Sequence, residues 1–202
     1  VRKEIVEISK SPRKTSREFD NNRFTIFAFG GSRGARSIKD AMIELVLRYQ
    51  HDPLQLIWIT GEKNYSEVKE ALNSKADTEG MNLRLHVLPY MYNIEEAFLA
   101  ADLAVCRAGA STLSELCLLG LPAILVPYPY AADNHQEFNA RALQNKKAAE
   151  MVIDEFLDGD TLYQKVEVLR RDSSLLKEMA GNLVKEAKPD ALKEILDIVL
   201  QQ

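Results

Sequence analysis

The sequence predicts an α/β protein with a Rossmann-like, doubly wound parallel sheet of about six strands. One observation is that short apolar runs alternate with helical patterns along most of the chain. A second is that two of these runs, residues 24–29 and 102–106, lead directly into glycine-bearing turns and then into helices. Strands that alternate with helices are joined by right-handed crossovers, which makes the sheet parallel. Ligands of such sheets bind beyond the carboxyl ends of the strands, so function is expected in the loops there.

The first half of the ordered body contains three strand–helix units. Each begins with a short run of apolar, β-branched or aromatic residues and continues with apolar residues at helical spacing. The strands are expected at residues 24–29, 54–59 and 83–87, and the helices at about 35–50, 64–76 and 93–100.

The second half repeats the same alternation and then ends in helices. The strands are expected at residues 102–106, 122–126 and 149–153, and the helices that follow the first two at about 112–119 and 134–144. A proline-rich loop, residues 127–136, separates the fifth strand from its helix. Three amphipathic patterns predict helices near residues 159–170, 173–186 and 189–201.

The chain is expected to form one domain with a short lead-in. Residues 1–22 are polar and contain Pro12, so they are expected to be an extended interdomain linker. Residues 23–202 are then expected to form a single ligand-binding domain with its C-terminal helices, because 202 residues of which 46% are hydrophobic can bury one core. The chain opens at Val1-Arg2 without a methionine, which suggests the interior of a longer protein.

Composition excludes several classes of function. A net charge of −4 argues against nucleic acid as a partner. Cys106 and Cys117 fall in segments expected to be buried, which favours core packing in a reducing cytoplasm over a disulfide. The three histidines show no metal-ligand spacing, and no apolar run reaches the ~20 residues of a membrane span. No signal peptide opens the sequence.

The first glycine turn, Gly30-Gly-Ser-Arg-Gly34, is a candidate phosphate-binding loop. It lacks the glycine spacing of the dinucleotide fingerprint and the Gly-Lys-Ser/Thr ending of a P-loop, which disfavours both. What remains is a nest of backbone amides with Ser32 as a hydroxyl donor, an arrangement suited to a diphosphate. The alternative is a plain strand-to-helix turn whose glycines serve only steric needs.

The second turn carries a carboxylate, Glu115, at the start of a helix. Ser111 or Thr112 could cap this helix, and Thr112-Leu-Ser-Glu115 matches a capping box in which the glutamate bonds back to the backbone. The alternative is that the two oxygens of Glu115 accept hydrogen bonds from a vicinal diol such as a ribose. The residues alone leave both readings open.

The loop at residues 127–136 and the helix after it offer amide and imidazole groups. Gln136 and Asn139 are three residues apart on one helical face, which suits a neutral polyol or simply a solvated surface. Asp133 or Asn134 could cap the helix. A catalytic role for His135 has little support, since no serine or cysteine nucleophile with an acidic partner can be paired to it.

Taken together, these motifs resemble the carboxy-terminal half of the MurG glycosyltransferases of family 28. Five segments carry the resemblance in order and span nearly the whole chain: Val1-Arg2, Gly30–Arg36, Arg107–Glu115, Gly120–Pro127 and Asp133–Ala140. Members of that family transfer N-acetylglucosamine from UDP-N-acetylglucosamine to lipid I, making lipid II for peptidoglycan. The resemblance implies a GT-B architecture in which this half binds the UDP-sugar donor.

The resemblance also implies what this half lacks. The lipid I acceptor site, the membrane-contacting patch and the catalytic base are expected in a missing N-terminal domain, so the catalytic residues are unknown and this half alone is expected to bind donor without turnover. The full protein is expected in the bacterial cytoplasm, peripheral on the cytoplasmic face of the membrane. No cofactor is expected in this half. The alternatives are a family relative with another acceptor and a non-catalytic nucleotide-binding domain.

By motif, the resemblance assigns the donor's diphosphate and ribose to one group of residues. Arg2 and Ser32 are expected near the diphosphate, with Gly31 in the same turn, and Glu115 is expected on the ribose hydroxyls. Arg33 stands where the family usually has glutamine, and this extra cation could strengthen contact with the diphosphate.

A second group is assigned to the base and the sugar. The backbone of Met91, just after Tyr90, is expected to recognise the uracil edge. The residues expected to contact the N-acetylglucosamine hydroxyls are Ala110, Gln136 and Asn139, with His135 beside them.

Overall fold

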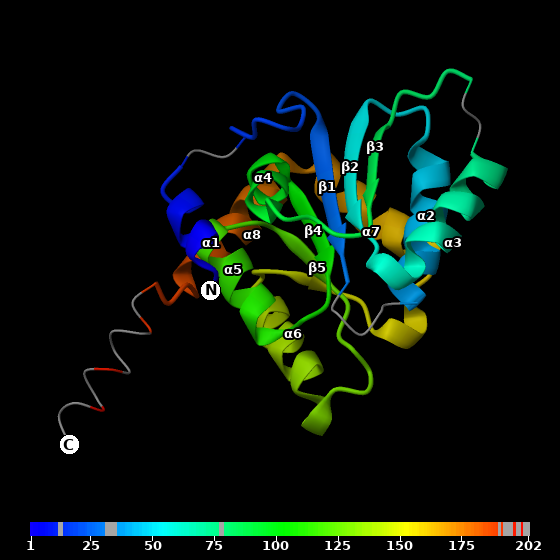
Figure 1. Cartoon of the computed structure of the whole chain (residues 1–202). Coiled ribbons are helices and arrows are strands. Elements are labelled where there is room, and N and C mark those ends of the chain that lie inside the picture. Colours follow the sequence, from blue (N-terminus) through cyan, green and yellow to red (C-terminus); the bar gives the residue numbers. More distant parts are fainter. Residues whose placement is uncertain are drawn as a thin grey trace.

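The computed structural model describes residues 1–11, 14–30, 36–76, 79–189, 191, 196 and 199. Within them, six strands form one fully parallel sheet in the order β3-β2-β1-β4-β5-β6 (Figure 1). The strands are β1 (Phe24–Phe29), β2 (Leu54–Ile59), β3 (Arg84–Leu88), β4 (Leu103–Cys106), β5 (Ala123–Leu125) and β6 (Glu150–Met151). This is the strand order of a doubly wound Rossmann sheet, and it confirms the predicted fold class.

Helices cover both faces of the sheet. They are α1 (Lys3–Ile8), α2 (Arg36–Tyr49), α3 (Glu62–Lys75), α4 (Ile94–Ala100), α5 (Ala110–Leu119), α6 (His135–Asn145), α7 (Gly159–Arg171) and α8 (Ser173–Lys185), with 3-10 turns at Ala132–Asn134 and Asp154–Phe156. Figure 1 shows α2, α3 and α7 along one face and α1, α4, α5 and α6 along the other. Helix α8 packs against both α5 and α7.

Two apolar clusters fill the space between the sheet and its helices. Side chains alternate across the sheet, so Ile26 joins the cluster under α2, α3 and α7, whereas its neighbour Phe27 joins the cluster under α4 and α5. The largest buried side chains include Trp58 on β2 and Phe98 on α4. These clusters fix the strand ends from which the loops of the pocket emerge.

Most expected elements are confirmed, and the largest correction concerns the lead-in. Residues 1–22 were expected to be extended, but Lys3–Ile8 forms α1, which contacts α4 and α5 through the fully buried Ile5. A six-residue helix gives too few turns for a periodic signal, and isolated helices of that length are marginal, so its existence depends on tertiary packing. The helix expected over 189–201 falls largely outside the described residues.

Candidate functional site

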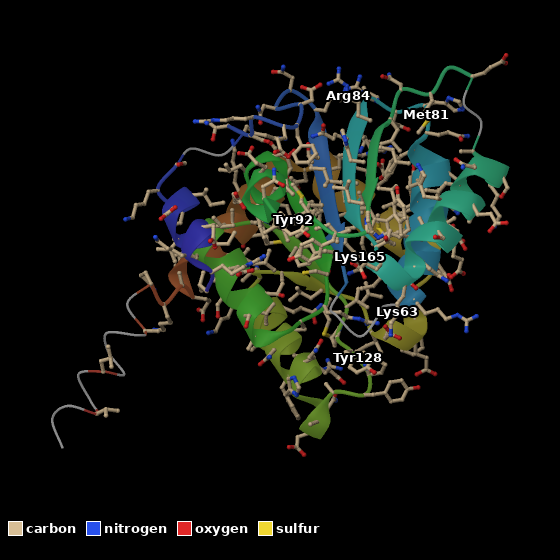
Figure 2. The ribbon with its side chains drawn as sticks, in the orientation of Figure 1. Lys63, Met81, Arg84, Tyr92, Tyr128 and Lys165 are labelled. Atoms are coloured by element: carbon tan, nitrogen blue, oxygen red, sulfur yellow. The ribbon has the colours of Figure 1, made fainter. Side chains whose placement is uncertain are left out.

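A cavity of about 820 Å³ opens at the carboxyl edge of the sheet. It is bordered by the ends of β1 and β2, the turn after β3, the segment 128–130 after β5, and Arg2 from the N-terminus. Figure 2 shows two of its lining residues, Lys63 from α3 and Tyr128 from the loop after β5, at this end of the sheet. The pocket therefore lies where parallel α/β sheets bind their ligands.

The described lining of the pocket is positively charged, although the whole chain carries a net charge of −4. It contains four cationic side chains and two carboxylates, namely Arg2, Arg36, Lys63 and Arg107 against Glu62 and Asp154. A cleft lined mainly by one sign of charge concentrates ligands of the opposite sign. The pocket is therefore suited to an anionic ligand.

Glu115 reaches the edge of this pocket through an ion pair with Arg2. The Arg2 guanidinium donates from Nε to Oε1 and from Nη2 to Oε2, both at 2.7 Å. Glu115 is only 4% exposed, whereas the side chain of Arg2 is 43% exposed. The hydrogen bond to Glu115 and the charge of its carboxylate raise the pKa of Arg2 above its ordinary value. The pair joins the N-terminus to the helix after β4.

The alternative that Glu115 closes a capping box is wrong. Helix α5 begins at Ala110 with Gly109 as its N-cap, and no side chain caps it. Thr112 lies inside the helix rather than at its start, so neither it nor Ser111 acts as the expected cap. The carboxylate of Glu115 is instead turned to Arg2, which occupies both of its oxygens.

Arg107, directly after β4, is a lining residue that the sequence analysis did not single out. It is 8% exposed, and its Nη1 donates to the carbonyls of Val126 and Pro127 at 3.2 and 3.1 Å and also to Asp154. Ser37 at the start of α2 donates its hydroxyl to the same Asp154 oxygen at 2.5 Å. The sequence feature that could have pointed to it is a charged residue between the apolar run at 102–106 and the glycine of the following turn.

The amides expected to contact a sugar form hydrogen bonds with the neighbouring loops. Gln136 Oε1 accepts from the backbone N–H of Tyr128 at 3.0 Å, and Asn139 Nδ2 donates to the carbonyl of Ala108 at 3.4 Å. The ring Nδ1 of His135 lies 2.7 Å from the carbonyl oxygen of Ala132. Asn134 is the N-cap of α6, but neither it nor Asp133 provides the expected side-chain cap.

Comparison with known families identifies the chain. Residues 25–195 match the family model described as the glycosyltransferase family 28 C-terminal domain, which covers most of the sequence. The chain belongs to glycosyltransferase family 28. The expected resemblance is thereby confirmed at the level of the family.

Family 28 relatives match along nearly the whole chain. The sequence is 41% identical to a UDP-N-acetylglucosamine–N-acetylmuramyl-(pentapeptide) pyrophosphoryl-undecaprenol N-acetylglucosamine transferase from Desulforamulus reducens, over 98% of this chain and 54% of the relative. It is 40% identical to the protein of the same name from Desulforudis audaxviator, with the same coverage. The chain thus spans about half the length of these relatives.

Solved structures agree with this assignment. Acinetobacter baumannii MurG superposes with a TM-score of 0.81 at 28% identity, over 96% of this chain and 55% of that one. The glycosyltransferase of kitacinnamycin, at 14% identity and a TM-score of 0.62, shows the shared fold alone. The fold is that of one half of a GT-B glycosyltransferase.

The residues that the family 28 resemblance singled out divide into three groups. Arg2, Tyr90 and Met91 line the pocket, and Glu115 contacts it through Arg2. Four others are not among the described lining, namely Ala110, His135, Gln136 and Asn139. Gly31, Ser32 and Arg33 lie outside the described residues. The binding roles of all these residues remain predictions.

Three further features of the described residues concern metal sites, membrane-spanning helices and cysteines. Among the described residues, His, Cys, Asp and Glu side chains form no group of three that could hold a metal ion. In the same part of the chain, no helix combines the length and the apolar character needed to cross a membrane. Cys106 and Cys117 are both buried and unpaired, and burial raises the pKa of Cys117 to about 11.

Proposed function

We propose that this chain is the donor-binding domain of an inverting glycosyltransferase that makes lipid II by transferring N-acetylglucosamine from UDP-N-acetylglucosamine to lipid I. The observation that carries the proposal is the cation-lined pocket of about 820 Å³ at the carboxyl edge of the sheet. The chain is also 41% identical to a transferase whose name states this chemistry. A nucleoside diphosphate sugar is anionic, and pockets for ligands of that size measure about 300–1,000 Å³.

The ribose, the uracil and the sugar of UDP-N-acetylglucosamine each contact different residues of this site. The carboxylate of Glu115 accepts the ribose hydroxyls, because two acceptor oxygens fit a vicinal diol. The backbone at Met91 faces the uracil, and Gln136 and Asn139 contact the sugar once the loop at 127–136 adjusts to the ligand. Arg2 already occupies both oxygens of Glu115, so ribose binding requires Arg2 to release or share at least one of them.

The reaction is a direct displacement at the anomeric carbon. The acceptor hydroxyl attacks that carbon while UDP leaves, and the hydroxyl proton passes to a base. The base, the lipid I site and the membrane contact on the cytoplasmic face lie in the part of the relatives that this chain does not cover. The departing diphosphate gains negative charge, which the cations of the pocket stabilise. This chain alone is therefore expected to bind donor without turning it over.

Calorimetric titration tests the proposal directly. The 202-residue chain is titrated with UDP-N-acetylglucosamine, with its C4 epimer UDP-N-acetylgalactosamine, and with UDP. Saturable binding that prefers the gluco sugar supports a donor site here. If neither the chain nor the longer protein binds any of the three, the proposal is wrong; binding by the longer protein alone would show that its other half completes the pocket. Transfer to a lipid I analogue by this chain would contradict the binding-only role.

A further inference from the structure

Arg107 lines the pocket with a buried guanidinium, and protein acceptors already bind one side of that guanidinium. The residue follows β4 at the centre of the sheet and lines the cavity while only 8% exposed. Its Nη1 faces three acceptors, which are the carbonyls of Val126 and Pro127 and the carboxylate of Asp154. Those contacts fix the plane of the guanidinium and consume the hydrogens of Nη1.

The opposite edge of the same guanidinium, formed by Nε and Nη2, lacks a strong partner. Nε is buried and has no hydrogen-bond partner among the described residues. In the same part of the chain, Nη2 has a single long hydrogen bond, to the hydroxyl of Ser37 at 3.4 Å. Buried polar groups are nearly always hydrogen-bonded, so a buried, unpartnered N–H on a residue that lines a pocket calls for an explanation.

Arg2 lines the same pocket, but in this residue the Nε and Nη2 edge of the guanidinium is the occupied one. Its Nε and Nη2 edge is closed by Glu115, with both hydrogen bonds at 2.7 Å. That edge is the planar fork with which arginine binds carboxylates and phosphates through two parallel hydrogen bonds. Of Arg2 and Arg107, only Arg107 leaves this fork without a strong partner among the described residues. Arg36 also lines the pocket, but its side chain is 91% exposed and is not held in place as Arg107 is.

We infer that Arg107 is a phosphate-binding residue, whose Nε and Nη2 fork receives oxygens of the donor's diphosphate. This inference rests on the proposed function and adds to it a residue that binds the phosphates. Asp154 is a positioning residue, because it holds Nη1 and is itself held by the Ser37 hydroxyl at 2.5 Å. Arg2 then acts mainly through Glu115 and so on the ribose.

Affinities for UDP and for uridine, which lacks the diphosphate, distinguish the role of Arg107 from that of Arg2. Arg107→Lys keeps a positive charge but removes the fork, so UDP affinity is expected to fall about 10- to 100-fold while uridine affinity stays within about twofold. Arg2→Lys is the matched control at the same pocket, and it is expected to change the affinities for UDP and uridine by similar factors, because Arg2 acts through Glu115 on the ribose that both ligands share. Unchanged UDP affinity in Arg107→Lys, or an equal loss for both ligands, would overturn the inference.

The wild-type chain provides a second test that does not depend on the folding of a variant. The Arg107 Nε–H resonance in a nitrogen–proton NMR spectrum is expected to shift downfield on titration with UDP and to stay in place with uridine. A resonance indifferent to UDP in a chain that binds UDP would refute the role of Arg107 and leave the proposed function standing. A wild-type chain and longer protein that bind neither UDP nor uridine would refute the proposed function itself.

Discussion

Arg2 and Arg107 line the same pocket and each binds a carboxylate, yet they are held in opposite ways. Arg2 precedes the short helix α1, and its side chain is 43% exposed. Its Nε and Nη2 both donate to Glu115. Arg107 directly follows the central strand β4, is 9% exposed at its side chain, and binds Asp154 through Nη1 only. The first pair links two chain segments, whereas the second fixes one guanidinium against the sheet.

The difference indicates which of the two contacts can change when a ligand binds. Helix α1 has six residues and one buried side chain, so it belongs to the part of a structure that opens at low cost. Arg107 is tied to the carbonyls that follow β5, and moving it would disturb the sheet edge. Exchange of Glu115 between Arg2 and a ribose is therefore easier than any rearrangement at Arg107.

The largest loss of unfolding free energy is expected for Asp154→Ala. It leaves the buried guanidinium of Arg107 without its carboxylate, and removal of one partner of a buried pair costs about 3 kcal/mol of unfolding free energy. Urea unfolding followed by circular dichroism measures this loss. Asp160→Ala is the control, because Asp160 pairs with Arg48 at the surface, where such pairs contribute less than about 1 kcal/mol. Equal losses in the two variants would show that the Arg107 pair is no stronger than a surface contact.

A smaller loss, about 2 kcal/mol, is expected for Ile5→Ala, which removes the buried contact of α1. Detachment of α1 also breaks the pair between Arg2 and Glu115 but leaves Arg107 in place. Amide hydrogen exchange is expected to accelerate at residues 3–8 and to remain slow in β4. Val6→Ala, at a 39% exposed position of the same helix, is the control. Faster exchange in β4 as well would mean that the two arginine sites are not independent.

Glu115→Ala is expected to cost less still, about 1.5 kcal/mol, because the partner left behind is the solvent-accessible Arg2. Uridine affinity is expected to fall about tenfold, since a lost hydrogen bond in a ligand site costs roughly that much. Glu178→Ala serves as the control, because Glu178 on α8 forms an exposed ion pair with Lys147, which follows α6. A stability loss larger than that of Asp154→Ala would reverse the order of the two pairs.

The sheet and its pocket edge could be predicted from sequence because their signals are local. The strands β1 and β2 begin and end where the apolar runs at 24–29 and 54–59 do, and the first glycine turn follows β1 directly. Periodicity alone carries this information, since each run is short, apolar and followed by a helical pattern.

The arginine pairs could not be predicted, because each joins residues far apart in the sequence. The pairing of Arg2 with Glu115 spans 113 positions, and that of Arg107 with Asp154 spans 47. Local reasoning instead offered the capping box at Thr112, which is an interaction between residues three positions apart. Family resemblance placed Arg2 and Glu115 at the same ligand but gave no sign that they bind each other.

The smallest expected effect is a decrease of the unfolding free energy at low pH, which arises at His86 and adds to any comparison of the two arginine pairs. Burial, followed by the charge of Arg84, lowers the pKa of His86, whose ring packs edge-on against Phe19 at 5.1 Å. The unfolded chain takes up a proton at this histidine near pH 6.5 while the folded chain does not, so stability falls as the pH drops below about 6.5. His86→Leu is expected to flatten this decline in urea titrations at pH 7, 6 and 5. A decline that persists in His86→Leu would place its source elsewhere, and the losses measured for Asp154→Ala and Glu115→Ala would then have to be compared at each pH separately.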